Sequence, residues 1–167
     1  MTVKAVAFIA RSGTGKTTLL ERVLPELLRR GLRVGALKHD AHRFDIDHPG
    51  KDSHRLTAAG AATMLITSAE KIALVKNHSE APSAEELIHT YFSDMDIVLV
   101  EGFSQSSLTK IELHRKDKGD PLICRGERHD PGLVAVASDE PLDLDVPVLD
   151  LNDPRSVADF IEGHFLR

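Results

Sequence analysis

The stretch A-R-S-G-T-G-K-T at residues 10–17 constrains the fold more than any other part of the sequence. It follows an apolar run at residues 3–10 and precedes residues 17–30, in which leucine and valine recur at helical spacing. A nearly continuous apolar run is typical of a strand that is covered on both faces. A strand, a glycine-rich turn and a helix in this order predict a loop whose backbone N–H groups bind phosphate.

The pattern G-x-x-x-x-G-K-[ST] is matched except at its first position, where this chain has Ala10. We expect the Lys16 ammonium to contact the β and γ phosphates and to act in catalysis, and the Thr17 hydroxyl to bind Mg²⁺. The residues expected to bind the nucleotide in this loop are Arg11, Ser12, Gly13, Thr14, Gly15, Lys16, Thr17 and Thr18. The alternative is a glycine-rich turn in which lysine and threonine follow by chance.

The rest of the chain alternates between predicted strands and predicted helices. Strands are expected at residues 33–39, 62–67, 71–76, 96–100, 110–114, 133–137 and 146–149, and helices at residues 51–59, 83–92 and from about 154 onward. Segments 62–67 and 71–76 are close enough to form a hairpin. Segment 110–114 alternates polar and apolar residues, so we expect it near an edge of the sheet. The order predicts an α/β fold, with a mainly parallel sheet and helices on both faces, in a single domain over residues 1–167.

Composition narrows the classes of partner. The net charge of −5 argues against a nucleic-acid surface built on bulk electrostatics. Aromatic residues make up 4% of the chain, which disfavours a stacking platform for single-stranded nucleic acid. No apolar run approaches the length of a membrane span, so we expect neither nucleic acid nor a membrane as partner. Cys124 is the only cysteine, which excludes an intramolecular disulfide and fits a reducing cytoplasm.

A candidate acidic site residue stands at the end of the apolar segment 96–100. Glu101 follows it directly, and ligands bind at the carboxyl ends of strands in parallel sheets. We expect Glu101 to hold Mg²⁺ or to orient an attacking water, in place of the usual Walker-B aspartate. A helix cap or a loop salt bridge is the alternative role.

Residues 38–62 form the densest polar stretch of the chain, with four histidines and four aspartates. Asp40 follows a predicted strand and is a candidate Mg²⁺ ligand and catalytic carboxylate. Lys51, Ser53 and Arg55 stand at a predicted helix start, where they could clamp a phosphate or an acidic substrate. A transition-metal site of histidines and carboxylates is an alternative, and solvated loop charge explains some of these residues.

Four segments together resemble the family of molybdopterin-guanine dinucleotide biosynthesis protein B, MobB: GTGKTTLLERVLPEL, KHDAHRFDIDHPGKDSHRLTAAGA, LVEGF and KIELHR. The resemblance covers residues 3 to about 139, with departures at Ala10 and at Ser104, where such proteins often carry lysine. It implies a three-layer P-loop NTPase fold, mainly parallel, with a β-hairpin extension. It also implies binding of GTP with Mg²⁺, slow GTP hydrolysis, a homodimer, and assistance to the guanylyltransferase that attaches GMP to molybdopterin. Molybdopterin itself is a further candidate ligand.

Asp139 is a candidate for reading guanine, because it lies just past the predicted strand at residues 133–137. A carboxylate can accept hydrogen bonds from both N1–H and the exocyclic amine of guanine, which adenine does not offer. A turn residue before Pro141 is the other interpretation of Asp139.

Two other functions stay open. A nickel-inserting metallochaperone GTPase would use the histidines, but Cys124 has only His129 nearby, unlike the cysteine-based motif usual in such proteins. In a small-molecule kinase, the polar residues at the start of the predicted helix 51–59 would bind an acceptor instead.

Overall fold

The computed structural model describes residues 3–40 and 44–167. The chain divides into two compact units, one made of Met1–His39 with Ser83–Arg167 and the other of Asp40–Pro82. We call them the sheet unit and the hairpin unit and describe each by itself.

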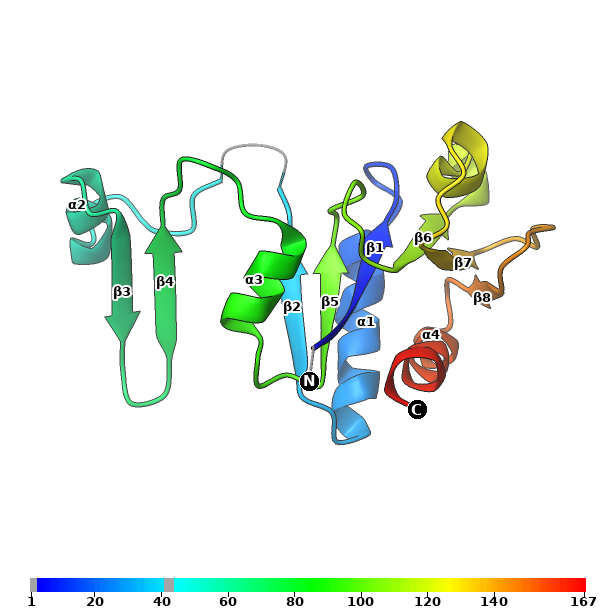
Figure 1. Cartoon of the computed structure of the whole chain (residues 1–167), viewed down its shortest axis with the longest axis horizontal. Coiled ribbons are helices and arrows are strands. Elements are labelled where there is room, and N and C mark those ends of the chain that lie inside the picture. Colours follow the sequence, from blue (N-terminus) through cyan, green and yellow to red (C-terminus); the bar gives the residue numbers. More distant parts are fainter. Residues whose placement is uncertain (1–2, 41–43) are drawn as a thin grey trace. The chain divides into compact units, whose positions relative to one another are not determined.

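The sheet unit is built on six parallel strands in the order β2-β5-β1-β6-β7-β8 (Figure 1). The strands are β1 (Lys4–Ile9), β2 (Val34–Lys38), β5 (Ile97–Glu101), β6 (Lys110–His114), β7 (Leu133–Ser138) and β8 (Val148–Asp150). The helices are α1 (Lys16–Arg29), α3 (Ala84–Tyr91) and α4 (Pro154–Ile161), with short helical turns at Lys116–Lys118, Ile123–Glu127 and Glu162–Leu166.

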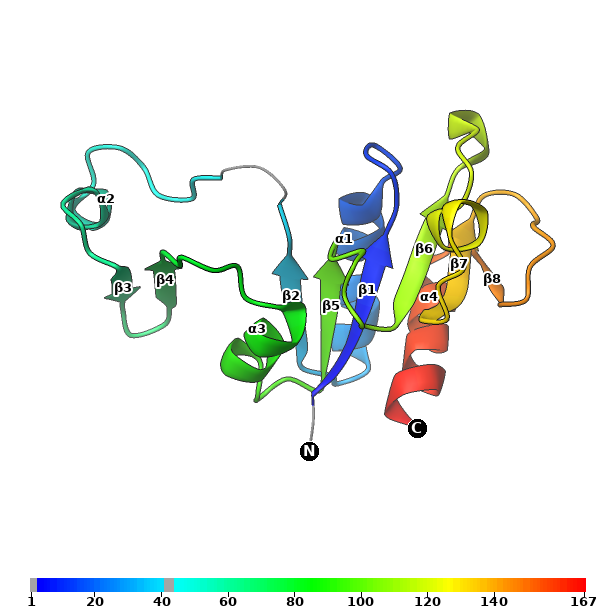
Figure 2. The ribbon, with the colours of Figure 1, turned by 45° about the horizontal axis from the view of Figure 1, so that its top comes forward.

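The sheet is covered on both faces, which gives three layers. Side chains along a strand point alternately to its two faces. On β1, Val6 and Phe8 pack with residues of α1 and α4, whereas Ala7 and Ile9 pack with Ile88 of α3. Figures 1 and 2 show α1 and α3 on opposite faces of the sheet. The predicted three-layer fold is thereby confirmed.

The position of β6 corrects one expectation. We expected residues 110–114 near an edge, but β6 lies between β1 and β7. Its polar residues are buried because they have polar partners: the Lys110 ammonium donates to two loop carbonyls, at 2.8 and 3.0 Å, and the Glu112 carboxylate accepts from the backbone amides of Ile123 and Cys124, at 2.6 and 2.9 Å. Alternation of polar and apolar residues therefore reflects an internal polar network here, and the expectation of an edge strand was wrong.

Helix α3 begins with the capping box that the sequence predicts. The Ser83 hydroxyl accepts a hydrogen bond from the amide of Glu86 at 3.2 Å, and the Glu86 carboxylate accepts one from the amide of Ser83 at 2.8 Å. This reciprocal pair satisfies backbone donors that the first helical turn leaves free.

The hairpin unit contains α2 (Asp52–Ala58) and the antiparallel pair β3 (Thr63–Thr67) and β4 (Ile72–Lys76). The predicted hairpin is confirmed. Leu65, Ile66 and Ile72 are each more than half exposed in the structure. A separate observation covers both units: no helix among residues 3–40 and 44–167 is long and apolar enough to cross a membrane.

Candidate functional site

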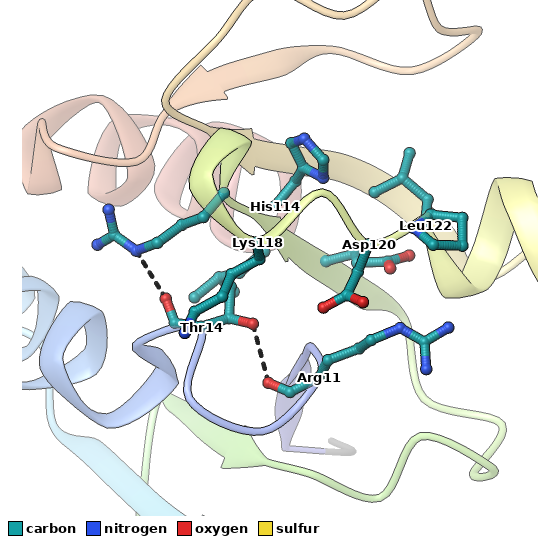
Figure 3. Close-up of a pocket in the computed structure, with 10 residues that line it drawn as sticks. Arg11, Thr14, His114, Lys118, Asp120 and Leu122 are labelled. Carbon is teal, nitrogen blue, oxygen red and sulfur yellow. Dashed lines mark hydrogen bonds between the residues drawn. The ribbon is translucent and has the colours of Figure 1, made fainter.

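The loop between β1 and α1 is held in a compact turn at the carboxyl edge of the sheet. Gly13 and Gly15 have φ angles of 75° and 100°, a region that glycine adopts without steric cost. Thr14 is buried, and its hydroxyl donates to the carbonyl of Arg11 at 2.9 Å (Figure 3). Phe103 is the only non-glycine residue in the described part of the chain with a positive φ, so Ala10 occupies a backbone conformation that does not require glycine.

Lys16 lies over this loop. Its ammonium donates to the carbonyl of Ala10 at 3.1 Å and to that of Arg11 at 3.4 Å. Burial lowers the pKa of Lys16 below its ordinary value, while the nearby Glu101 carboxylate acts in the opposite direction. The loop thus carries a partly desolvated positive charge, which suits a phosphate group. Ser12, which precedes Lys16 in the sequence, and Thr18, which follows it, are both exposed.

The expected metal ligands Thr17 and Glu101 come together. The Thr17 hydroxyl donates to the Glu101 carboxylate, at 2.9 Å from Oε2 and 3.1 Å from Oε1. They meet because β1 and β5 are neighbouring parallel strands, with Phe8 opposite Glu101 in the register. A hydroxyl and a carboxylate are hard oxygen donors, and Mg²⁺ prefers such ligands together with phosphate oxygens and water. The donor set therefore fits Mg²⁺.

Sequence reasoning missed Lys38 as part of this site. The ammonium of Lys38 lies 3.4 Å from Oε1 of Glu101, and the two residues are paired in the register of β2 and β5. The signal was available, because Lys38 falls in a predicted strand and carboxyl ends of parallel strands share one edge. The sequence did not indicate that β2 and β5 pair with each other, and this pairing is what brings Lys38 to Glu101.

A third carboxyl end contributes Asp139, directly after β7. Its carboxylate accepts a hydrogen bond from the backbone amide of Lys116 at 2.8 Å and lies 3.4 Å from Nη1 of Arg115. The hydrogen bond from the Lys116 amide, with the charge of Arg115, lowers the pKa of Asp139. Arg115, which sequence reasoning also missed, donates from Nε to the carbonyl of Thr14 at 2.9 Å.

Arg11 extends from the loop toward the segment after β6. Its guanidinium donates a hydrogen bond to the Glu127 carboxylate in an ion pair. This hydrogen bond and the charge of Glu127 raise the pKa of Arg11. Figure 3 shows the small pocket between the loop and this segment, with Arg11 and Thr14 on one side and Lys118 and Asp120 on the other. Charged side chains of both signs therefore line this flank of the loop.

The other predicted site residues belong to the hairpin unit. Lys51 immediately precedes α2, the Ser53 hydroxyl donates to the Asp47 carboxylate at 3.0 Å, and Arg55 lies 3.3 Å from Asp52 in an exposed ion pair. Asp40 is the first residue of the same unit. The structure thus joins Lys16, Thr17 and Glu101 in one site of the sheet unit, while these four residues belong to the hairpin unit.

A transition-metal cluster finds no support in the described residues. No three His, Cys, Asp or Glu side chains converge within residues 3–40 and 44–167, while His42, one of the histidines considered, lies outside them. Cys124 is fully buried, and burial raises the pKa of its thiol to about 11. Because the thiolate is the form that binds metal, Cys124 is poorly suited to the cysteine-based site of a nickel-inserting protein.

The family model for molybdopterin guanine dinucleotide synthesis protein B (MobB) matches residues 5–139. The molybdopterin-guanine dinucleotide biosynthesis adapter protein of Escherichia coli K12 is 44% identical, over 95% of this chain and 91% of that protein. The adapter protein of the same name from Haemophilus influenzae is 40% identical, over 91% of this chain and 84% of its own length.

Solved structures agree with the sequence relatives. A crystal structure of MobB superimposes with a TM-score of 0.75 at 28% identity, covering 95% of this chain and 97% of the other. A crystal structure of Bacillus subtilis MobB gives a TM-score of 0.76 at 25% identity, covering 97% and 98%. The expected fold and the expected family are both confirmed: by sequence and by structure, this chain belongs to the MobB family.

Proposed function

We propose that this protein is a GTP-binding adapter of molybdenum cofactor biosynthesis, which assists the conversion of molybdopterin to its guanine dinucleotide form. One observation carries the proposal: Lys16, Thr17 and Glu101 converge at the carboxyl edge of a parallel sheet. The sequence relatives support the same proposal, because this chain is 44% identical to a protein named as a molybdopterin-guanine dinucleotide biosynthesis adapter.

The loop at residues 10–17 binds the phosphates in this proposal. Its backbone N–H groups and the N-terminus of α1 offer partial positive charge to phosphate oxygens. The Lys16 ammonium exchanges the carbonyls of Ala10 and Arg11 for the β and γ phosphates. The exchange is favourable because a charged phosphate is a stronger acceptor than a neutral carbonyl.

Thr17 and Glu101 hold Mg²⁺ in the same proposal, and Asp40 is a further candidate ligand. Bound Mg²⁺ would neutralise charge on the β and γ phosphate oxygens. The Thr17 hydroxyl, which donates to Glu101, would supply a neutral oxygen ligand beside that carboxylate. Glu101 or Asp40 orients the attacking water, and hydrolysis is slow, in keeping with a protein that acts as an adapter.

The proposed partner is the guanylyltransferase that attaches GMP to molybdopterin. Lys51, Ser53 and Arg55 are candidates for binding molybdopterin or nucleotide phosphate, since they combine positive charge with a hydroxyl near the start of α2. We place the protein in the cytoplasm, with no nucleic-acid or membrane partner.

A homodimer is the proposed assembly, with β3 and β4 at its interface. An isolated two-stranded hairpin is marginally stable in water. The exposed side chains of Leu65, Ile66 and Ile72 offer apolar surface that a second copy of this chain could bury.

The deciding experiment is calorimetric binding of GTP, ATP and their diphosphates, with and without Mg²⁺, to the wild type and to Lys16→Ala. Selective GTP binding that needs Mg²⁺ and is lost in Lys16→Ala is the expected result. Lys4→Ala, at the opposite end of β1, is the matched control and should bind as the wild type does. Preferential ATP binding would contradict the proposal and favour a small-molecule kinase.

A further inference from the structure

Arg115 connects two parts of the site that are distant in sequence. It is the first residue after β6, and its Nε donates to the carbonyl of Thr14 at 2.9 Å, a contact across 101 positions of the chain. A Cβ built at Gly15 would lie 3.6 Å from Nη2 of Arg115, so the guanidinium packs directly against the Thr14–Gly15 peptide. The loop is therefore supported from the β6 side at the peptide that precedes Lys16.

This contact fixes the direction of a backbone donor. The peptide bond is trans, so the carbonyl of Thr14 and the amide of Gly15 point in opposite directions from one peptide plane. With the carbonyl directed at Arg115, the amide of Gly15 faces away from Arg115. Gly13 and Gly15, which flank Thr14, place few steric limits on the backbone, so the bond from Arg115 restricts the rotation of this peptide.

Asp139 in turn holds Arg115. Its carboxylate lies 3.4 Å from Nη1 of Arg115 and accepts a hydrogen bond from the amide of Lys116 at 2.8 Å. A second pair joins the same two strand ends, since Nε2 of His114 lies 3.0 Å from Oε1 of Glu140. These contacts join the ends of β6 and β7. They therefore limit the movement of the Arg115 side chain, which contacts the loop.

We propose that Arg115 is a positioning residue that orients the Thr14–Gly15 peptide for phosphate binding, and that Asp139 acts by holding Arg115. The inference rests on the proposed nucleotide-binding function and deepens it. It assigns Asp139 a role in affinity for the phosphate chain, which any nucleoside triphosphate shares. The alternative, in which Asp139 reads guanine, would use the lone pairs of its carboxylate that these two partners do not occupy.

The test uses inorganic tripolyphosphate, which has the charged chain of GTP but no base. Calorimetry with Mg²⁺ compares binding of GTP, ATP and tripolyphosphate to the wild type, Arg115→Ala, Arg115→Lys and Asp139→Asn. Arg115→Ala should weaken all three ligands by the same factor, about tenfold, the size of one charge-assisted hydrogen bond. Arg115→Lys should recover part of the loss, because an ammonium can reach one of the two partners but lacks the fork that spans both.

The double variant separates positioning from independent contacts. Asp139→Asn alone should weaken all three ligands about threefold, and should add nothing in the Arg115→Ala background, since the two residues act in series. The NMR amide resonance of Gly15 should shift in Arg115→Ala and in Asp139→Asn. A loss of stability elsewhere in the protein would not produce this shift. Arg33→Ala is the matched control, because Arg33 also pairs with an aspartate, Asp96 at 3.0 Å, outside this site.

Three results would overturn the inference. One is unchanged tripolyphosphate binding in both Arg115 variants while the wild type binds it. Another is a selective loss of GTP, with ATP and tripolyphosphate unaffected, in Asp139→Asn, which would make Asp139 the guanine reader. The third is a wild type that binds none of the three ligands, which would overturn the proposed function and the inference together. A melting temperature close to that of Arg33→Ala would confirm that a variant is folded.

Discussion

The hydroxyl of Thr17 donates to the carboxylate of Glu101 at 2.9 Å, across 84 positions of the chain. Both oxygen atoms are the kind that Mg²⁺ binds, and the fold places them within hydrogen-bond distance of each other. The metal-binding part of the proposed site is therefore largely formed by the fold itself.

Glu101→Gln should reduce Mg²⁺-dependent GTP binding by about tenfold, because a neutral amide oxygen is a weaker ligand for a hard cation than a carboxylate. Binding measured without Mg²⁺ should stay the same or become stronger, since a negative charge near the phosphates is removed. Calorimetry at matched ionic strength measures both. Glu21→Gln, an exposed site on α1, makes the same change of charge and should leave both values unaltered. Equal losses with and without Mg²⁺ would remove Glu101 from the metal site.

Lys38→Met should lower the Mg²⁺ concentration needed for half-maximal GTP binding by about threefold. Lys38 lies 3.4 Å from the Glu101 carboxylate, so its ammonium competes with a metal ion for the same oxygen. The pair itself should add little to stability, because the Lys38 side chain is 59% exposed and such pairs are screened by solvent. A titration of Mg²⁺ at fixed GTP gives the midpoint. A higher midpoint in Lys38→Met would show that Lys38 assists the metal instead.

Glu112→Ala should lower the free energy of unfolding by about 3 kcal/mol, since the part-buried amide of Ile123 and the buried amide of Cys124 lose their acceptor. Glu112→Gln should cost less, because its amide oxygen still accepts one of these bonds. Urea unfolding of the two variants gives the comparison. Similar stability of Glu112→Ala and the wild type would mean that this network does not support β6.

Leu65→Lys should weaken the proposed homodimer by at least about tenfold, because a charge would replace an apolar side chain at the centre of β3. The monomer should stay folded, since Leu65 is 53% exposed. Sedimentation equilibrium measures the association constant. Leu28→Lys makes the same change at a similarly exposed leucine on α1, outside β3 and β4, and is the control that should leave association unaltered. A wild type that stays monomeric at every concentration tested would contradict this assembly.

Local sequence was enough to predict most elements. The strand, loop and helix around residues 10–17 follow from an apolar run, two glycines and a helical repeat that are adjacent in the chain. The same holds for the capping box at Ser83 and for the hairpin of β3 and β4, whose partners are separated by few residues. Glu101 was predicted as a site residue because ligands bind at the carboxyl ends of strands in parallel sheets. The single domain over residues 1–167 stays a prediction, beside a structure that separates two compact units.

The tertiary structure decided which strand ends are neighbours. Placing β5 between β2 and β1 brings Lys38 to Glu101, and placing β6 beside β1 brings Arg115 to Thr14. It also buries Glu112, whose alternating context had suggested an edge. The sequence by itself determined the local elements and the chemistry of the phosphate loop, because these depend on residues a few positions apart. The partners that orient this loop were decided by strand order alone, since their contacts join segments about a hundred residues apart and no local pattern encodes them.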